Sequence, residues 1–153
     1  LNALTDPACI QALYRASQAG VSVDLQVRGI CSLRPGVAGI SERITVTSLV
    51  GRFLEHSRMF YFQSGQEEEL WMGSADLMPR NLDGRIEVVF PVESPHLRRA
   101  IRATILFPHL RDTAQLRRMN EKGLYERVLP QPGTPARLPT THAGSGGKLE
   151  PAR

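Results

Sequence analysis

A histidine and an arginine two positions apart, His56 and Arg58, stand in the segment FLEHSRMFYF at residues 53–62. The aromatic residues that follow them are typical of a buried strand. Residues i and i+2 of an extended chain share a face, so both side chains should point the same way if the strand begins near Glu55. Imidazole can transfer a proton near neutral pH and guanidinium can hold phosphate oxygens. Taken alone, however, the pair is better explained by structural packing.

A second segment, GSADLMPRNLDGRIEVVF at residues 73–90, repeats polar side chains at the period of a strand. Ser74 closes the preceding strand, and Asn81, Asp83, Arg85 and Glu87 then recur at every second position, which on an extended chain aligns them on one face. The same pattern would suit the solvated face of an edge strand, or a surface ion pair. Because Asn and Asp are poor strand formers, we favour a binding site.

The third candidate is Arg28, which follows the alternating segment VSVDLQV and precedes Gly29. This places it at the carboxyl end of a predicted strand, the edge at which open α/β sheets bind their ligands. A solvated arginine at a strand end is an equally good explanation of this residue by itself.

The elements that would position these residues alternate between helix and strand. Asp6 as N-cap, Pro7 at the first helical position and Gly20 as the stop predict a helix. A helix that leads into a strand favours an α/β layer fold. Strands are expected at residues 21–28, 44–50, 58–62, 69–72 and 85–90, with a second long helix at 94–110 after a Ser cap.

The formal net charge is +4, and 17 of the 19 basic residues are Arg. A basic chain suits an anionic partner, and the planar guanidinium fork can hold phosphate oxygens in pairs. An Arg-rich proteome from a GC-rich genome would give the same composition. The two cysteines have no partner at metal-ligand or redox spacing, so a reducing cytoplasm is the simplest compartment.

The ends of the chain differ from its middle. Residues 129–153 carry Pro, Gly, Ser and Thr without periodic apolar residues, so we expect one domain at 1–128 followed by a disordered tail. No apolar run is long enough for a membrane span, and no secretion leader is visible. The first residue is Leu and stands just before a helix, which suggests a piece of a longer protein.

Three of these segments together resemble one family. VRGICSLRPGVAGIS, GRFLEHSRMFYF and SADLMPRNLDGRIEV look like the C-terminal catalytic domain of type 1 polyphosphate kinase, which is related in fold to the phospholipase D superfamily. That superfamily's pattern of a His, a base two residues on, and a later Gly and Ser is similar to His56, Arg58, Gly73 and Ser74. Arg58 departs from it, since phospholipases use Lys. Asp76 and PRNLD also match, whereas Leu77 replaces the family's usual Trp, and we expect this to alter packing more than chemistry.

The resemblance implies a phospholipase D-like mixed sheet flanked by helices, and a reaction: reversible transfer of the terminal phosphate of ATP to inorganic polyphosphate, with Mg²⁺, through a phosphohistidine. It places the phosphorylated histidine and the magnesium ligands in a preceding domain that this sequence does not contain. It maps the family's second histidine to His56, as a catalytic residue, and its ATP-contacting arginines to Arg28 and Arg85. Supporting roles fall to Arg58, Ser74, Arg80, Asn81, Asp83 and Glu87, and no metal ligand falls within the chain.

Two other functions stay open at this point. A phosphodiesterase or nuclease of the phospholipase D type would prefer Lys at position 58, and a non-catalytic polyanion-binding module would explain the missing nucleophile. We expect ATP, ADP, polyphosphate and the rest of the kinase chain as partners, a homo-oligomer at full length, and no nucleic acid. The compartment is expected to be the cytoplasm, with peripheral binding at the inner membrane left open. Arg117, Arg118 and Arg127 could line a polyanion path, but a solvated helix face explains them better.

Overall fold

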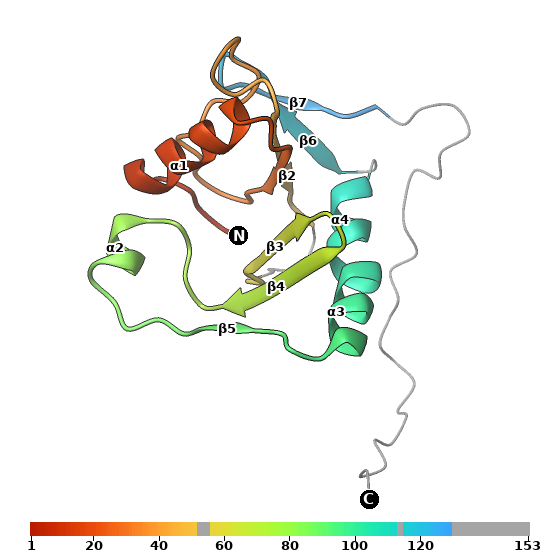
Figure 1. The fold of residues 1–153 in the computed structure, drawn as a ribbon. Helices are drawn as coiled ribbons and strands as arrows, with labels where there is room; N and C mark the ends of the chain where they lie inside the picture. Colours follow the sequence, from red (N-terminus) through yellow and green to blue (C-terminus); the bar gives the residue numbers. More distant parts are fainter. Residues whose placement is uncertain (52–55, 113–114, 130–153) are drawn as a thin grey trace, which may run out of the picture.

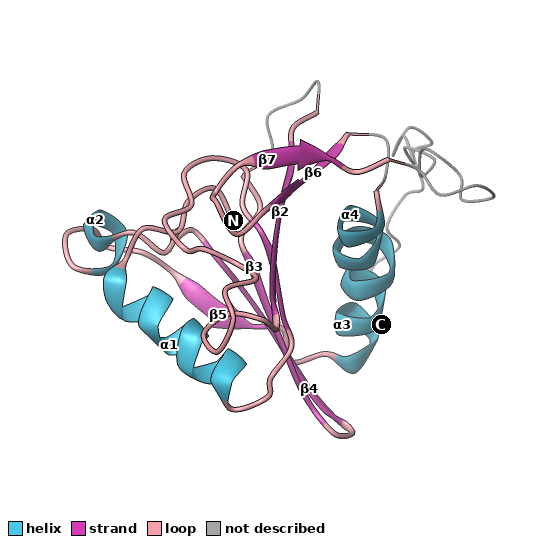
Figure 2. Cartoon of the chain, turned by 90° about the horizontal axis from the view of Figure 1, so that it is seen from above, coloured by secondary structure: helices cyan, strands magenta, loops and turns pink. Residues whose placement is uncertain are grey.

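The computed structural model describes residues 1–51, 56–112 and 115–129, in which helices pack on both sides of a layer of strands. The helices are α1 (Pro7–Gln18), α2 (Pro79–Leu82), α3 (Pro95–Ile101) and α4 (Phe107–Arg111), with a π-helical turn at Arg102–Leu106 between α3 and α4. Figure 1 traces the chain, and Figure 2 shows the strands edge-on with α1 on one side and α3 and α4 on the other. The expected α/β class is confirmed.

The strands form two sheets. The first is mixed, with the order β1 (Val23–Gln26), β2 (Ile44–Leu49), β6 (Leu116–Met119) and β7 (Tyr125–Arg127); the second has the order β3 (Met59–Ser64), β4 (Glu67–Gly73) and β5 (Val89–Pro91). Among these described strands, β1 and β2 pair in parallel, and the other neighbouring strands pair antiparallel. The mixed sheet flanked by helices is therefore present, and an antiparallel sheet accompanies it.

Helix α1 begins and ends where the sequence predicts. The Asp6 carboxylate accepts a hydrogen bond from the backbone N–H of Cys9 at 2.8 Å, and Pro7 occupies the first turn, where its missing N–H costs nothing. Gly20 follows the C-cap with φ of +92°, a conformation that a side chain would strain. The apolar face of α1, Ile10 and Leu13 included, packs on the core of the mixed sheet.

The core lies between α1 and one face of the mixed sheet. Val27 and Val46 are fully buried, and Ile44 and Met119 are almost so. Burial of such side chains contributes about 1.5–3 kcal/mol each to the stability of the fold. This packing fixes the carboxyl ends of β1 and β2, and with them the position of Arg28.

The first four residues lie between two other segments of the chain and join them. Leu4, which is fully buried, forms parallel bridges with Cys31 on one side and Leu77 on the other. The backbone N–H of Arg28 donates to the carbonyl of Leu1 at 3.1 Å. The segment after β1 and the segment after β4 are thereby held together, although neither pairs with the other directly.

A buried carboxylate reinforces this junction. Asp76 is 4% exposed and accepts hydrogen bonds from the backbone N–H of Asn2 at 2.7 Å and from Arg58, with Nε to Oδ1 at 3.2 Å and Nη2 to Oδ2 at 2.9 Å. Burial alone raises the pKa of Asp76, but the hydrogen bonds from Arg58 and Asn2 and the charge of Arg58 outweigh it and lower the pKa to about 2. The carboxylate is therefore ionised at neutral pH.

The expectation of an extended chain through residues 81–87 is wrong. Pro79 begins the short helix α2, Asn81 lies inside it, and Asp83 is its C-cap. The strand expected at 85–90 begins only at Val89, and Ile86 is fully exposed. Proline is favoured in the first turn of a helix, and this preference outweighs the alternation of polar residues that follows.

The helix expected at residues 94–110 is present but interrupted. Ser94 caps it, accepting from the N–H of Leu97 at 3.4 Å. The chain widens into the π-helical turn just before Pro108, which lacks the N–H that a regular turn would need. Arg102 in this turn binds Glu68 and Tyr61, so the helix is fastened to the β3–β4 hairpin.

The solvated helix face expected for Arg117, Arg118 and Arg127 is also wrong, because β6 and β7 form a hairpin there. Gly123 has φ of +81° in the turn, and the Oδ1 of Asn120 accepts the N–H groups of Lys122 and Leu124 at 3.0 Å each. This turn chemistry reverses the chain.

The boundary expected at 128/129 stays a prediction, because residues 130–153 of the expected tail lie outside the described residues. Among the residues that are described, the helices are too short or too polar to cross a membrane.

We predict that Asp76→Asn lowers the free energy of unfolding by about 3 kcal/mol, because it leaves Arg58 without its counter-charge in a buried setting. Urea denaturation measures the loss, and Glu93→Asn, at an exposed position, serves as the control. The folded pKa of Asp76 is depressed, so its contribution is complete above the unfolded pKa near 4 and is lost as pH falls toward 2. Equal unfolding energies for Asp76→Asn and the wild-type chain would contradict this role.

Candidate functional site

The Arg58 side chain binds other residues of the site. Its Nε and Nη2 bind Asp76, and its Nη1 donates to the backbone carbonyl of His56 at 2.8 Å. The hydrogen bond to Asp76 is the main cause that raises the pKa of Arg58, so the guanidinium stays charged. Regular strand structure begins only at Met59, so His56 and Arg58 lie just before β3 instead of inside it. Arg58 therefore holds the chain that carries His56, in place of the direct phosphate contact that the sequence suggested.

Glu87 accepts hydrogen bonds from a second group of side chains. Its Oε2 accepts from the hydroxyl of Ser74, and its Oε1 accepts from Nδ2 of Asn81 at 2.6 Å. These two hydrogen bonds, followed by the charges of Arg85 and Arg58, lower the pKa of Glu87. Ser74, Asn81 and Glu87 are thus brought together, but through a short helix and a turn and not through a shared strand face.

Ser74 connects this group to the edge of the second sheet. The Ser74 hydroxyl accepts from the N–H of Val88 at 3.1 Å, and its own N–H donates to the carbonyl of Val88 at 3.0 Å. A Cβ at Gly73 would come within 2.4 Å of the Val88 carbonyl oxygen, so only glycine permits this close approach. The Gly and Ser of the motif therefore set the geometry of Glu87.

Arg28 lies on the other side of the N-terminal segment. The backbone N–H of Arg28 donates to the carbonyl of Leu1, and the N–H of the next residue, Asn2, donates to Asp76. On the other side of the site, the charges of Arg85 and Arg58 both act on Glu87. Arg58 binds Asp76, so it lies between the two groups, and the convergence of Arg28 with Arg85 stays a prediction.

His56 and Arg85 are both exposed. Within the described part of the chain, the His56 ring makes no hydrogen bond. Arg28 is half-buried. The site thus presents an imidazole and guanidinium groups outward, while its two carboxylates are engaged by neighbouring side chains.

Two predicted supporting residues are not brought into this network. Arg80 lies in α2 and Asp83 at its end, and both are exposed. Neither side chain makes a hydrogen bond or an ion pair with another described residue. Asp76 and the backbone of Asn2 carry more of the geometry than the sequence reasoning assigned to them. The signal for Asp76 was its place two residues after the Gly–Ser pair at the end of β4.

One side-chain atom of Asn81 has no hydrogen-bond partner among the described residues. The residue is 5% exposed, and its Oδ1 is buried without a hydrogen-bond partner among the described residues. No group of three or more His, Cys, Asp or Glu side chains within the described ranges could hold a metal ion.

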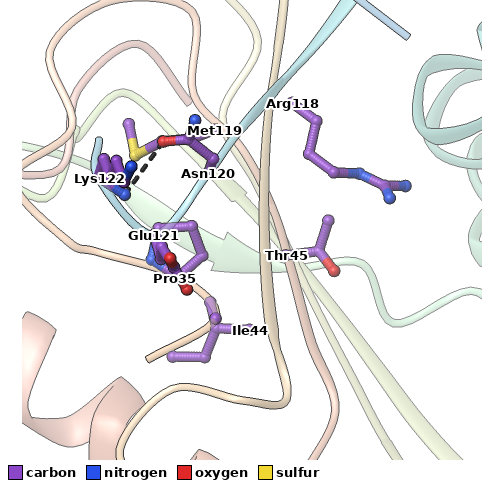
Figure 3. A pocket seen from close by; sticks show the side chains of 9 residues that line it. Pro35, Ile44, Thr45, Arg118, Met119, Asn120, Glu121 and Lys122 are labelled. Carbon is purple, nitrogen blue, oxygen red and sulfur yellow. Dashed lines mark hydrogen bonds between the residues drawn. The ribbon is translucent and has the colours of Figure 1, made fainter. Parts of the chain in front are cut away.

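The larger of two hollows, of about 420 Å³, lies at the opposite edge of the mixed sheet, where β2 begins and β6 ends. Figure 3 shows Ile44 and Thr45 there, with Lys122 and Asn120 in the turn between β6 and β7. A second hollow of about 310 Å³ lies between this sheet and α4. Neither is lined by a residue of the predicted site, which is an exposed edge instead of a closed pocket.

Comparison with known proteins identifies the family. Residues 1–137 match the family described as "Polyphosphate kinase C-terminal domain 2". The chain is 61% identical over 102 residues to polyphosphate kinase 1 of Chlorobaculum tepidum, which covers 67% of this chain and 15% of that protein. It is 51% identical over 130 residues to a polyphosphate kinase of Pseudomonas aeruginosa, covering 85% of this chain and 19% of the relative.

A solved structure agrees with these sequence relatives. The crystal structure of polyphosphate kinase from Porphyromonas gingivalis superposes with a TM-score of 0.84 at 44% identity, over 90% of this chain and 21% of that one. The chain thus spans about a fifth or less of the length of these relatives. It belongs to the polyphosphate kinase family, as a member of the group described as C-terminal domain 2.

Proposed function

We propose that this chain is the ATP- and polyphosphate-binding C-terminal part of a polyphosphate kinase, which transfers the terminal phosphate of ATP reversibly to polyphosphate through a phosphohistidine on another part of the enzyme. The observation that carries the proposal is the contact network: Arg58 with Asp76, and Ser74 with Glu87, link the segments that resemble the family. Identity of 51% over 130 residues with a named polyphosphate kinase supports it.

Phosphate transfer from ATP requires positive charge and one group that can transfer a proton. In an in-line displacement at phosphorus, negative charge builds up on the oxygen that leaves, on the side opposite the nucleophile. On this proposal His56, which is exposed and lies just before β3, faces such an oxygen. Proton transfer from a positioned side chain contributes about 10²- to 10⁴-fold to a rate, which is the share we assign to His56.

On this proposal, Arg28 and Arg85 stabilise the negative charge of the phosphates. Guanidinium groups bind phosphate oxygens in pairs, and they do so most strongly where no carboxylate competes for them. Asp76 is engaged by Arg58, and Glu87 by Ser74 and Asn81, so both carboxylates are already satisfied. The two arginines are therefore available to the phosphates of ATP.

Mg²⁺ would neutralise phosphate charge when it is bound. Following the resemblance, we propose that its ligands lie outside this chain, together with the phosphorylated histidine. On this proposal the chain alone is inactive, the full-length kinase is a homo-oligomer, and its compartment is the cytoplasm, with or without peripheral binding at the inner membrane.

Phosphodiester hydrolysis of the phospholipase D type is not favoured. Phospholipases of that superfamily use a lysine where this chain has Arg58, and Arg58 here is occupied by Asp76 and by the carbonyl of His56. The relatives compared above are named polyphosphate kinases. A polyanion-binding module without catalysis differs from the proposal in one testable respect, which is the effect of replacing His56 on polyphosphate synthesis.

We predict that His56→Ala lowers ATP-dependent polyphosphate synthesis at least 100-fold in a polyphosphate kinase that carries this chain, because the proton-transfer group is lost. Synthesis is followed by incorporation of γ-labelled phosphate into polymer. His96→Ala changes a histidine that is also exposed but lies in α3, and it should retain full activity. Near-normal synthesis by the His56 variant would remove this residue from the mechanism and favour a binding module.

We predict that the 153-residue chain alone takes up no acid-labile label from γ-labelled ATP, since the phosphorylated histidine is proposed to lie elsewhere. A full-length polyphosphate kinase in the same assay provides the positive control. An acid-labile phosphoprotein formed by the chain itself would show that a nucleophile is present among its own residues.

We predict that Arg28→Gln and Arg85→Gln each weaken ATP binding about tenfold, because each removes a charge-assisted hydrogen bond to phosphate. The matched control is Arg43→Gln, which removes the same charge from an exposed position beside the start of β2. Calorimetric titration distinguishes the two cases. An equal effect of all three substitutions would mean that net charge, and not a defined site, determines the affinity.

A further inference from the structure

The face of the mixed sheet that lies under α4 is polar, although the sheet face beneath a helix is usually apolar. Asp24 on β1 is the register partner of Thr45 on β2, and Thr47 on β2 is the cross-strand partner of Arg118 on β6. Register partners share a face of the sheet, and so do residues two apart on one strand. All four side chains therefore lie on the face opposite to the buried Val46, and packing alone does not explain them.

These side chains line a hollow between the sheet and α4. It is the second hollow, of about 310 Å³, and Phe107 and Arg111 of α4 line its other side. Small-molecule sites in proteins have volumes of roughly 300–1,000 Å³, so this hollow suits a compact ligand. Figure 2 shows α4 beside the strands, and Figure 3 shows Thr45 and Arg118 directed away from Lys122.

Two guanidinium groups from different elements line the hollow. Arg111 belongs to α4 and Arg118 to β6, and both are exposed. Neither makes an ion pair with a described residue, and Glu126, opposite Arg118, instead accepts a hydrogen bond from Nδ2 of Asn120 at 2.6 Å. Two guanidinium groups without a carboxylate partner can hold one phosphate group through charge-assisted hydrogen bonds.

Asp24 gives the same hollow an acidic end. From Asp24 across β2 to Arg118 there are two strand spacings and two residues along the strand, or about 12 Å between Cα atoms. The Asp24 carboxylate makes no ion pair with another described residue, so it can accept hydrogen bonds from hydroxyl groups. A chain of phosphates would bring negative charge toward this carboxylate, which disfavours polyphosphate as the ligand. The charges match a molecule with a phosphate at one end and hydroxyl groups at the other.

We propose that the hollow between the mixed sheet and α4 binds a sugar phosphate, with Arg111 and Arg118 on the phosphate and Asp24 on the sugar hydroxyls. The ligand is either a free pentose phosphate or the same group within a nucleoside monophosphate. No residue proposed to contact ATP lines this hollow, so the inference goes beyond the proposed function and does not depend on it.

The test is a calorimetric titration of the 153-residue chain with ribose 5-phosphate, AMP, inorganic phosphate, tripolyphosphate and ATP. We expect ribose 5-phosphate to bind about tenfold more tightly than inorganic phosphate, because only a ligand with a sugar reaches Asp24. AMP binding at least as tight as that of ribose 5-phosphate would point to a nucleotide, and weaker AMP binding would point to a free sugar phosphate. Both results support the proposal.

Matched variants separate a defined site from net charge. Arg118→Gln should weaken binding of ribose 5-phosphate and of inorganic phosphate about tenfold, whereas Arg15→Gln, in the last turn of α1, should change either by less than about twofold. Asp24→Ala should lose about tenfold for ribose 5-phosphate and keep its affinity for inorganic phosphate. Glu42→Ala is the control for the acidic end. All four positions are exposed, so we expect each variant to fold, which thermal unfolding checks.

Amide chemical shifts locate the ligand without any substitution. Ribose 5-phosphate should shift the amide signals of Thr45, Thr47 and Leu116, which line the hollow, and leave that of Ser74 unchanged. Shifts confined to the surroundings of Ser74 would overturn the proposal, because they would place the ligand beside Glu87.

Three further results would overturn it. The first is failure of both ribose 5-phosphate and AMP to bind, and the second is an equal loss of affinity in Arg118→Gln and Arg15→Gln. The third is tighter binding of tripolyphosphate or ATP than of AMP in this hollow, which would make it a site for the substrates of the kinase. Each of these results leaves the predicted effects of His56→Ala on polyphosphate synthesis unchanged.

Discussion

The buried carboxylate of Asp76 is the interaction on which the geometry of the site depends. It joins three segments far apart in sequence, through the backbone of Asn2, the guanidinium of Arg58 and its own place after β4. Removing an ion pair from water costs several kcal/mol, and the attraction offsets this only where the remaining hydrogen-bonding positions are also filled. Asp76 meets that condition by accepting from Arg58 and from backbone N–H groups. An apolar contact could fill the same space but could not fix the orientation of Arg58.

The orientation of Arg58 then determines where His56 lies. Nη1 of Arg58 binds the His56 carbonyl, so the backbone of His56 is tied to Asp76 and, through Asn2, to the segment that pairs beside Arg28. Glu87 repeats the principle on the other side, with Ser74 and Asn81 as its partners. The two carboxylates thus bind neighbouring side chains, while His56 and Arg85 remain exposed.

Much of the fold could be predicted because local signals agreed with tertiary structure. Asp6 and Pro7 define the start of α1, and the alternation around Val27 gives a strand whose buried face packs on that helix. The prediction for residues 81–87 was wrong because polar residues at every second position were taken as evidence of a strand. Pro79 starts a helix there, and Glu87 reaches Asn81 through a hydrogen bond between residues six apart, which no periodicity encodes. The grouping of these residues was predicted, and the backbone that groups them was not.

The segment at 116–127 shows how much a change of secondary structure alters a functional argument. Leu116 and Met119 are spaced like one face of a helix, and short apolar patterns of this kind do not distinguish helix from strand. In a helix, Arg117 and Arg127 would be separated by about 15 Å along the axis. In the hairpin they are direct partners. A functional argument that places these two side chains on one helix face therefore fails, because the chain reversal brings together residues that a helix would keep apart.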